Sequence, residues 1–193
     1  MQSDITRILL LVTQTFDHIG IPYAVGGSLA SSLYGIMRAT LDVDIVADMR
    51  REHIEPLVAA ISQEFYADAG MIHGAIEHHG SFNLVHYETA FKVDVFIRKT
   101  RAFDRLQLER RRFLVIATDP ERGIFVASPE DTILAKLEWF RLGGEVSNQQ
   151  WRDILGVMEA RPGELGLDYL RQWANELGVS DLLERALREA DKT

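Results

Sequence analysis

Three aspartates and a glycine pair are the residues of this sequence whose types and spacing could carry out chemistry. Gly26-Gly27-Ser28 follows a short apolar run, and Asp42 and Asp44 come after thirteen further residues. Asp94 lies in another apolar run, residues 91–97. Carboxylate oxygens are the ligands that Mg²⁺ prefers, and glycines ahead of a helix let backbone N–H groups approach a phosphate. This combination indicates a site that handles phosphates together with a divalent cation.

The Asp-x-Asp pair is expected on one face of a strand, because residues 41–47 alternate between apolar and polar positions. Residues two apart on a strand are separated by roughly 6 to 7 Å at the backbone. Two carboxylates about 6 Å apart repel by roughly 2 to 3 kcal/mol at an effective dielectric of 20. The arrangement makes most sense if a divalent ion neutralises Asp42 and Asp44.

Asp94 completes an acid cluster if its strand pairs beside the strand that carries the other two aspartates. Three such carboxylates could hold two Mg²⁺ ions, which would clamp the attacking and leaving oxygens of a phosphoryl transfer. Asp94 is then also the candidate base for an incoming hydroxyl. Lys92 shares its strand face with Asp94.

The elements that must position these residues are readable from hydrophobic periodicity and from turn residues. We expect a helix over 5–19, a strand ending at residue 25, a small-residue helix over 28–33 and a strand over 41–47. Residues 51–65 read as one helix. Strands are expected at 82–87, 91–97, 113–116 and 124–127, and helices at 128–142, from 147, at 166–177 and at 180–190.

The character of the chain changes at Ser128, where Ser128-Pro129-Glu130-Asp131 is a strong helix start. The sequence therefore predicts a mixed α/β domain over residues 1–127, with a sheet flanked by helices. A C-terminal helical subdomain follows over residues 128–193.

The pattern resembles the nucleotidyltransferase superfamily of the polymerase-β type. With Arg38, Thr40, a Lys136 helix and Trp151-Arg152-Asp153 added, it looks closest to the AbiEii-like nucleotidyltransferases, which include toxins of bacterial toxin-antitoxin pairs. The resemblance implies transfer of a nucleoside monophosphate from an NTP to a hydroxyl of RNA, protein or a small molecule, with pyrophosphate leaving. The residues that it implies for nucleotide binding are Gly26, Gly27, Ser28, Arg38, Thr40 and Lys136, with Asp42, Asp44 and Asp94 as metal-binding and catalytic acids.

Each assignment has a simpler alternative. A glycine pair before a helix can be only a tight turn, and an Asp-x-Asp strand can be only an exposed sheet face. Arg38 and Thr40 could order a loop instead of contacting a phosphate or base, and Lys136 could form a surface salt bridge. Asp153 falls nearly opposite the apolar face of its helix and could be a solvent-facing acid. The alternative function is a catalytically inactive member of the fold that binds nucleotide or a partner protein.

Composition excludes several other classes. The 193 residues are 47% hydrophobic, carry a formal charge of -8 and contain no cysteine. They are therefore expected to form a globular core without disulfides, thiolate metal sites or cysteine nucleophiles, and without general attraction for nucleic acid. No apolar run is long enough for a membrane span, so a cytoplasmic location is the default expectation. The basic stretch 98–112 could contact an RNA acceptor or be a solvated helix face.

Overall fold

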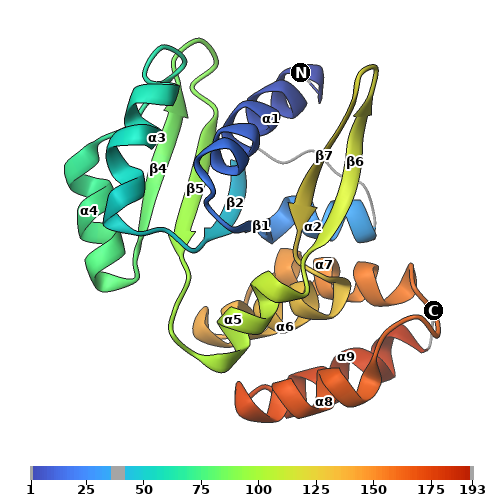
Figure 1. Ribbon diagram of the computed structural model, residues 1–193. Coiled ribbons are helices and arrows are strands. Elements are labelled where there is room, and N and C mark those ends of the chain that lie inside the picture. Colours follow the sequence, from blue (N-terminus) through green and yellow to red (C-terminus); the bar gives the residue numbers. More distant parts are fainter. Residues whose placement is uncertain (1, 36–41, 192–193) are drawn as a thin grey trace. The chain divides into compact units, whose positions relative to one another are not determined.

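The computed structural model describes residues 2–35 and 42–191 (Figure 1). These residues form two compact units. The first consists of the described residues up to Gly26 and from 42 to 126, and the second consists of 27–35 and 127–191. The expected division into domains 1–127 and 128–193 remains a prediction, because a compact unit need not fold by itself.

The first unit is built on a seven-stranded mixed sheet, with strand order β3-β4-β5-β2-β1-β7-β6. β2 pairs with β5 and β1 pairs with β7 in parallel, and the remaining neighbours are antiparallel. The strands are β1 (Tyr23–Val25), β2 (Asp42–Ala47), β3 (Phe65–Tyr66), β4 (Ser81–His86), β5 (Lys92–Ile97), β6 (Arg112–Thr118) and β7 (Glu121–Val126).

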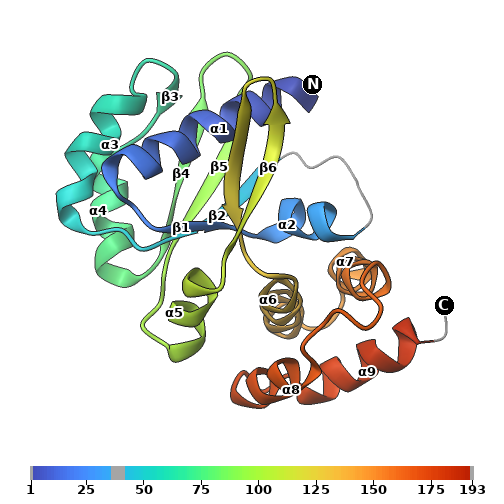
Figure 2. The same ribbon diagram turned by 45° about the vertical axis from the view of Figure 1, so that its right-hand side comes forward.

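Helices α1 (Gln2–Ile19), α3 (Ile54–Ile61) and α4 (Ala69–His78) lie on one side of this sheet (Figures 1 and 2). β2, β4 and β5 all alternate between buried and more exposed residues, which is the pattern of a strand covered on one face. The first unit also contains the short helix η1 (Arg51–His53) and α5 (Ala102–Glu109).

The sequence prediction of one helix over 51–65 was wrong in its extent. The helical segment ends at Ile61, and Phe65 starts the edge strand β3, which pairs with β4. Phe65 is buried as a strand residue, with its ring packed edge to face on His86 of β4, and its apolar character was misread as helical periodicity. Helix α4 was not predicted, although Asp68 caps it by accepting a hydrogen bond of 2.7 Å from the Met71 N–H.

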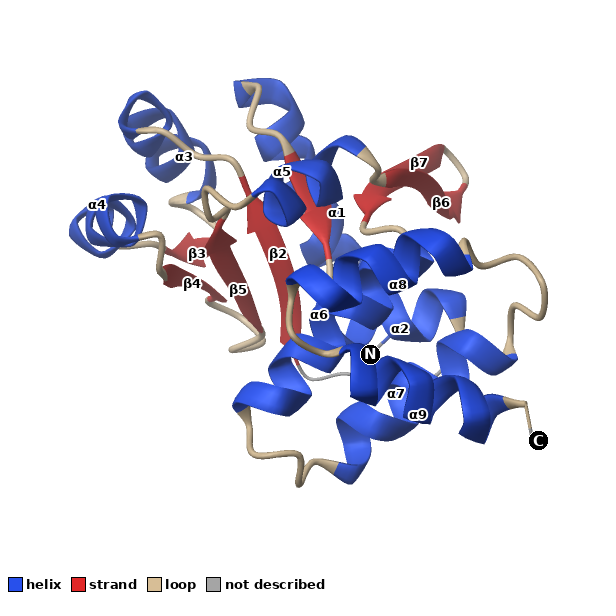
Figure 3. Ribbon diagram, turned by 90° about the horizontal axis from the view of Figure 1, so that it is seen from below, coloured by secondary structure: helices blue, strands red, loops and turns tan. Residues whose placement is uncertain are grey.

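The second unit consists of helices, with no strand among its described residues (Figure 3). The Ser128 hydroxyl caps α6 by accepting a hydrogen bond of 3.1 Å from the Asp131 N–H, and Pro129 occupies the first turn, as the sequence predicted. Helix α7 packs against α2, α6 and α9. The helices are α2 (Gly27–Tyr34), α6 (Pro129–Leu142), α7 (Asn148–Glu159), α8 (Leu167–Glu176) and α9 (Ser180–Ala190).

The structure confirms the predicted fold class, a mixed sheet flanked by helices together with a C-terminal group of helices. None of the described helices combines the length and the apolar character that crossing a bilayer requires.

Candidate active site

The acidic residues meet at the centre of the sheet, where β2 and β5 run parallel. Asp44 is the register partner of Asp94, and Asp42 is the partner of Lys92. Neighbouring strands lie about 4.8 Å apart, so side chains of register partners project side by side from the same face. The pairing of strands that the acid cluster needs is therefore present.

The acid face is the less buried face of these strands. Val43 and Ile45 on β2, and Val93 and Val95 on β5, are buried. The aspartates occupy the alternate positions and project from the opposite face. Hydrophobic burial of the valines and of Ile45 thus fixes the direction in which the carboxylates point, because a slip of one residue would expose the apolar set.

Two neighbours hold the carboxylate of Asp94. Lys92 Nζ lies 2.8 Å from Asp94 Oδ2, and the Asn83 amide donates a hydrogen bond to Asp94 Oδ1. Asn83 is the register partner of Asp94 on β4. The hydrogen bond to Asp94, together with the negative charges of Asp94, Asp42 and Asp44, raises the pKa of the Lys92 ammonium. Lys92 therefore lies within the field of all three acids.

The donor set has the chemistry that Mg²⁺ prefers, since all three acidic groups are carboxylates. Within residues 2–35 and 42–191, however, no three histidine, aspartate or glutamate side chains are placed as ligands of one ion. The Lys92 ammonium supplies the positive charge beside Asp94 instead. The residues present fit a divalent cation in type, strand register and face, and Asp94 could ligate it once Lys92 moves aside.

Gly26 links the glycine motif to the acid row. Its N–H donates a hydrogen bond of 2.8 Å to the Asp44 carbonyl, which extends the pairing of β1 with β2. A Cβ on Gly26 would meet no described atom within 4 Å, so packing does not demand glycine there. Gly27 follows with φ of 56°, a left-handed conformation that glycine adopts without strain. Open space at Gly26 suits close approach of a ligand to the backbone.

The remaining predicted nucleotide-binding residues belong to other parts of the chain. Ser28 lies in the first turn of α2, whose N–H groups have no acceptor within the helix. The hydroxyl of Ser31 donates to the Gly27 carbonyl at 2.9 Å and ties this turn together. Arg38 and Thr40 lie outside the described residues.

Lys136 and Asp153 form an ion pair inside the second unit. Lys136 Nζ lies 2.9 Å from Asp153 Oδ2, and the two side chains are 9% and 8% exposed. The Gln149 amide donates to the other oxygen of Asp153 at 3.1 Å. The expectation of a solvent-facing Asp153 was wrong, because α7 is covered on several sides and its apolar stripe does not mark its only packed face. The pair is not the surface salt bridge considered for Lys136.

Sequence reasoning did not single out Asn83. Its position on a strand was predicted, but only the register of β4 against β5 places its amide at Asp94.

The basic stretch 98–112 is less available for binding an anionic ligand than its number of positive charges suggests. Arg98 pairs with Asp48 at 3.1 Å, and Arg101 pairs with Asp104 at 2.6 Å.

Comparison with known proteins gives structural likeness only. No protein-family model matches the sequence, and no curated protein sequence matches it. An antigenic nucleotidyltransferase-like protein from Paracoccidioides brasiliensis is similar in structure, with a TM-score of 0.58 and 21% identity, over 96% of this chain and 93% of that one.

Two antibiotic-modifying proteins are also similar. A lincosamide antibiotic adenylyltransferase bound to lincomycin gives a TM-score of 0.51 at 16% identity, over 81% of this chain and 96% of that one. ANT(2'')-Ia in complex with adenylyl-2''-tobramycin gives a TM-score of 0.52 at 12% identity, over 91% of this chain and 97% of that one. This chain therefore has the nucleotidyltransferase fold. The likeness to the AbiEii-like group remains a hypothesis.

Proposed function

We propose that the protein is a Mg²⁺-dependent nucleotidyltransferase that moves a nucleoside monophosphate from an NTP to a hydroxyl acceptor. The observation that carries the proposal is the row of Asp44 on β2 and Asp94 on β5, with Asp42 on the same face. Carboxylates arranged on adjacent strands repel one another unless a cation joins them. The nucleotidyltransferase fold supports a phosphate-bearing substrate for this arrangement.

The proposed reaction joins the acceptor oxygen to the α-phosphorus and breaks the bond between the α-phosphorus and its bridging oxygen to the β-phosphate. Pyrophosphate leaves with the electrons of the broken bond, and Asp94 takes the proton of the acceptor hydroxyl. Asp42, Asp44 and Asp94 would hold two Mg²⁺ ions. Bound Mg²⁺ would neutralise the negative charges of the carboxylates and of the phosphate oxygens.

The nucleotide-binding part of the proposal involves the backbone at Gly26, Gly27 and Ser28. First-turn N–H groups of a helix favour a phosphate, and the space at Gly26 leaves room for one. Lys136, Arg38 and Thr40 are proposed as further phosphate or base contacts. For Lys136 this requires an exchange of its partner Asp153 for the phosphate.

A small-molecule hydroxyl is the acceptor that we favour over RNA. Two proteins of similar structure carry an antibiotic or an adenylylated antibiotic, which supports this substrate class by analogy. Two arginines of the basic stretch are neutralised by aspartates, which weakens the argument for an RNA backbone there. A role as one half of a toxin-antitoxin pair, with a cognate antitoxin as partner, rests on the sequence resemblance alone.

The second candidate is a catalytically inactive protein of the same fold that binds a nucleotide or a partner protein. The Lys92–Asp94 ion pair favours this candidate. The Lys92 ammonium lies 2.8 Å from the Asp94 carboxylate, the candidate base, and supplies there the positive charge that a metal ion would otherwise supply. The enzyme and the nucleotide-binding form of this candidate differ in turnover and not in nucleotide binding.

The experiment is incubation of the protein with Mg²⁺, each labelled NTP and a panel of hydroxyl acceptors that includes aminoglycosides, lincosamides and total RNA. Release of pyrophosphate with transfer of label to one acceptor supports the enzyme, provided that Asp42→Ala/Asp44→Ala abolishes it. NTP binding without transfer supports the inactive candidate. Absence of both binding and transfer contradicts the enzyme and the nucleotide-binding form of the inactive candidate.

A further inference from the structure

The strand β6 forms one end of the sheet, and its partner among the described residues is β7 alone. Figure 2 shows the β6–β7 hairpin at the margin of the sheet in the first unit. An edge strand exposes N–H and C=O groups at every second residue, and these can pair with another chain. Edge strands usually carry a charge or a proline that discourages such pairing. Residues 113–117 of β6 contain neither.

The apolar side chains of β6 are also unusually exposed. Phe113 is 56% exposed and Val115 is 46% exposed. Phe113 is nevertheless fixed in place: its ring packs edge to face on Phe125 at 5.4 Å, and it covers Gly123, where a Cβ would come within 2.5 Å of the ring. The strand therefore presents an ordered apolar surface. An ordered surface loses less side-chain entropy on binding than a disordered one.

A register irregularity in β6 allows the strand to pair antiparallel with a second copy of itself. The register shifts between Val115 and Ala117, so Phe113 pairs with Phe125 while Thr118 pairs with Glu121. Phe125 and Glu121 are an even number of residues apart on β7 and therefore share a face. Phe113 and Thr118 thus share a face as well, although they are five positions apart, an odd number.

The same holds for the other face of β6. Leu114 pairs with Ile124 and Ala117 pairs with Arg122, and these two partners also lie two apart on β7. If two β6 strands pair antiparallel with Phe113 opposite Thr118, Leu114 then lies opposite Ala117. In each of these opposed pairs, the two side chains then project from the same face of the joined sheet, as an antiparallel ladder requires.

The charges at the two ends of β6 fit this register. Arg112 begins the strand and Asp119 follows its last residue, and both are exposed. Antiparallel pairing with Phe113 opposite Thr118 brings Arg112 of one copy opposite Asp119 of the other. A two-fold axis repeats this contact, so the pairing gains two opposite-charge contacts, one at each end.

We propose that β6 is a homodimerisation edge, on which a second copy of this chain adds its own β6 and joins two seven-stranded sheets into one. The inference does not depend on the proposed function, because it rests on the edge strand, its register and its terminal charges. Main-chain pairing supplies the affinity, and the Arg112–Asp119 contacts set the register.

The test is the mass of the intact protein in solution, measured by light scattering and sedimentation over the micromolar range. We expect a concentration-dependent dimer. Val115→Lys should weaken it at least about tenfold, since it places a charge in the middle of each paired edge. Leu142→Lys is the matched control, because Leu142 is equally apolar and is 66% exposed on α6. It should leave the dimer unchanged.

A charge exchange tests the register itself. Arg112→Glu and Asp119→Arg should each weaken the dimer, and the double variant should restore it, because opposite charges face each other again. Circular dichroism spectra and melting curves would check that each variant is folded. A protein that stays monomeric at all concentrations overturns the proposal. A dimer that survives Val115→Lys, or one that the double variant does not restore, overturns it too, since another surface or register would then be responsible.

Discussion

Asp44 on β2 lies directly opposite Asp94 on β5, in a parallel pairing that keeps both carboxylates on the less buried face of the sheet. Asp94 in turn accepts from Asn83 and pairs with Lys92. The local charge is thus partly balanced within the chain, and the carboxylates stand where a divalent cation could replace the ammonium. This relationship leads to the first two predictions.

The first prediction concerns Asp44→Asn. The variant should lose nucleotide transfer by at least about 100-fold and should bind Mn²⁺ more weakly than the wild type, because one of the three anionic ligands is neutral. In the absence of divalent ions it should melt at a higher temperature, since the repulsion from Asp94 is removed. Pyrophosphate release, Mn²⁺ titration by electron paramagnetic resonance and calorimetry would measure these three effects in turn.

Asp168→Asn is the matched control, because Asp168 is exposed in the first turn of α8 and belongs to the second unit. Its Mn²⁺ affinity should equal that of the wild type. Unchanged Mn²⁺ binding in Asp44→Asn would show that the row of acids is an ordinary sheet surface.

The second prediction concerns Lys92→Met. Removing the ammonium 2.8 Å from Asp94 should raise the affinity for Mn²⁺ roughly fivefold, because a unit charge close to a divalent ion costs on the order of 1 kcal/mol in a water-like dielectric. The metal-free variant should melt at a lower temperature than the wild type and should recover on addition of Mg²⁺. Weaker Mn²⁺ binding in this variant would mean that Lys92 assists the site in another way.

The third prediction concerns the buried pair of Lys136 and Asp153. Asp153→Asn should lower the free energy of unfolding by about 3 to 5 kcal/mol, because it leaves a buried ammonium without its counter-charge. The double variant Lys136→Met/Asp153→Leu should be much less destabilised than the sum of its single changes. Urea unfolding of the wild type, Lys136→Met, Asp153→Leu and the double variant gives the coupling energy. Additive effects within about 0.5 kcal/mol would show that the two groups do not interact.

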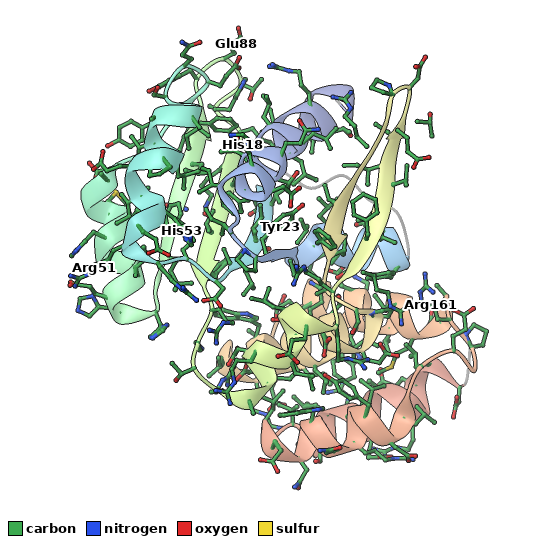
Figure 4. All side chains as sticks on the ribbon, viewed as in Figure 1. His18, Tyr23, Arg51, His53, Glu88 and Arg161 are labelled. Atoms are coloured by element: carbon green, nitrogen blue, oxygen red, sulfur yellow. The ribbon has the colours of Figure 1, made fainter. Side chains whose placement is uncertain are left out.

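The fourth prediction concerns Tyr23 on β1, in the first unit (Figure 4). Burial raises the pKa of its hydroxyl to about 12, although the Phe125 N–H donates a hydrogen bond to the oxygen at 3.3 Å. The folded state therefore favours the neutral phenol over the phenolate. This contribution to stability is fully present below the ordinary pKa of about 10 and is lost as the pH rises towards 12.

A shift of that size corresponds to roughly 3 kcal/mol. Wild-type protein should lose stability steeply above about pH 10, and Tyr23→Phe should lose less over the same interval. Urea unfolding at a series of alkaline pH values would measure the difference, and ultraviolet titration would follow tyrosinate formation in the native state. Parallel pH profiles for the two proteins would rule out Tyr23 as the titrating group.

Local sequence signals predicted most elements because their causes are local. Ser128 and Pro129 start α6 through a cap and a fixed backbone angle, and the alternation of residues 42–47 follows from burial of one sheet face. The same reasoning failed at Phe65, which is a buried residue of strand β3 with its ring against His86 of β4 and does not belong to a helix. Burial alone does not reveal which kind of neighbour causes it.

The sequence by itself determined the identity of the acids, their spacing and the face that each strand must bury, because side-chain alternation and hydrophobic burial act over a few residues. Only the tertiary structure decided that Asp44 stands opposite Asp94 and that Asn83 and Lys92 hold the latter. It also decided that Asp153 is buried against Lys136. Strand register and helix packing join residues far apart in the chain, and no local periodicity encodes which distant side chains will meet.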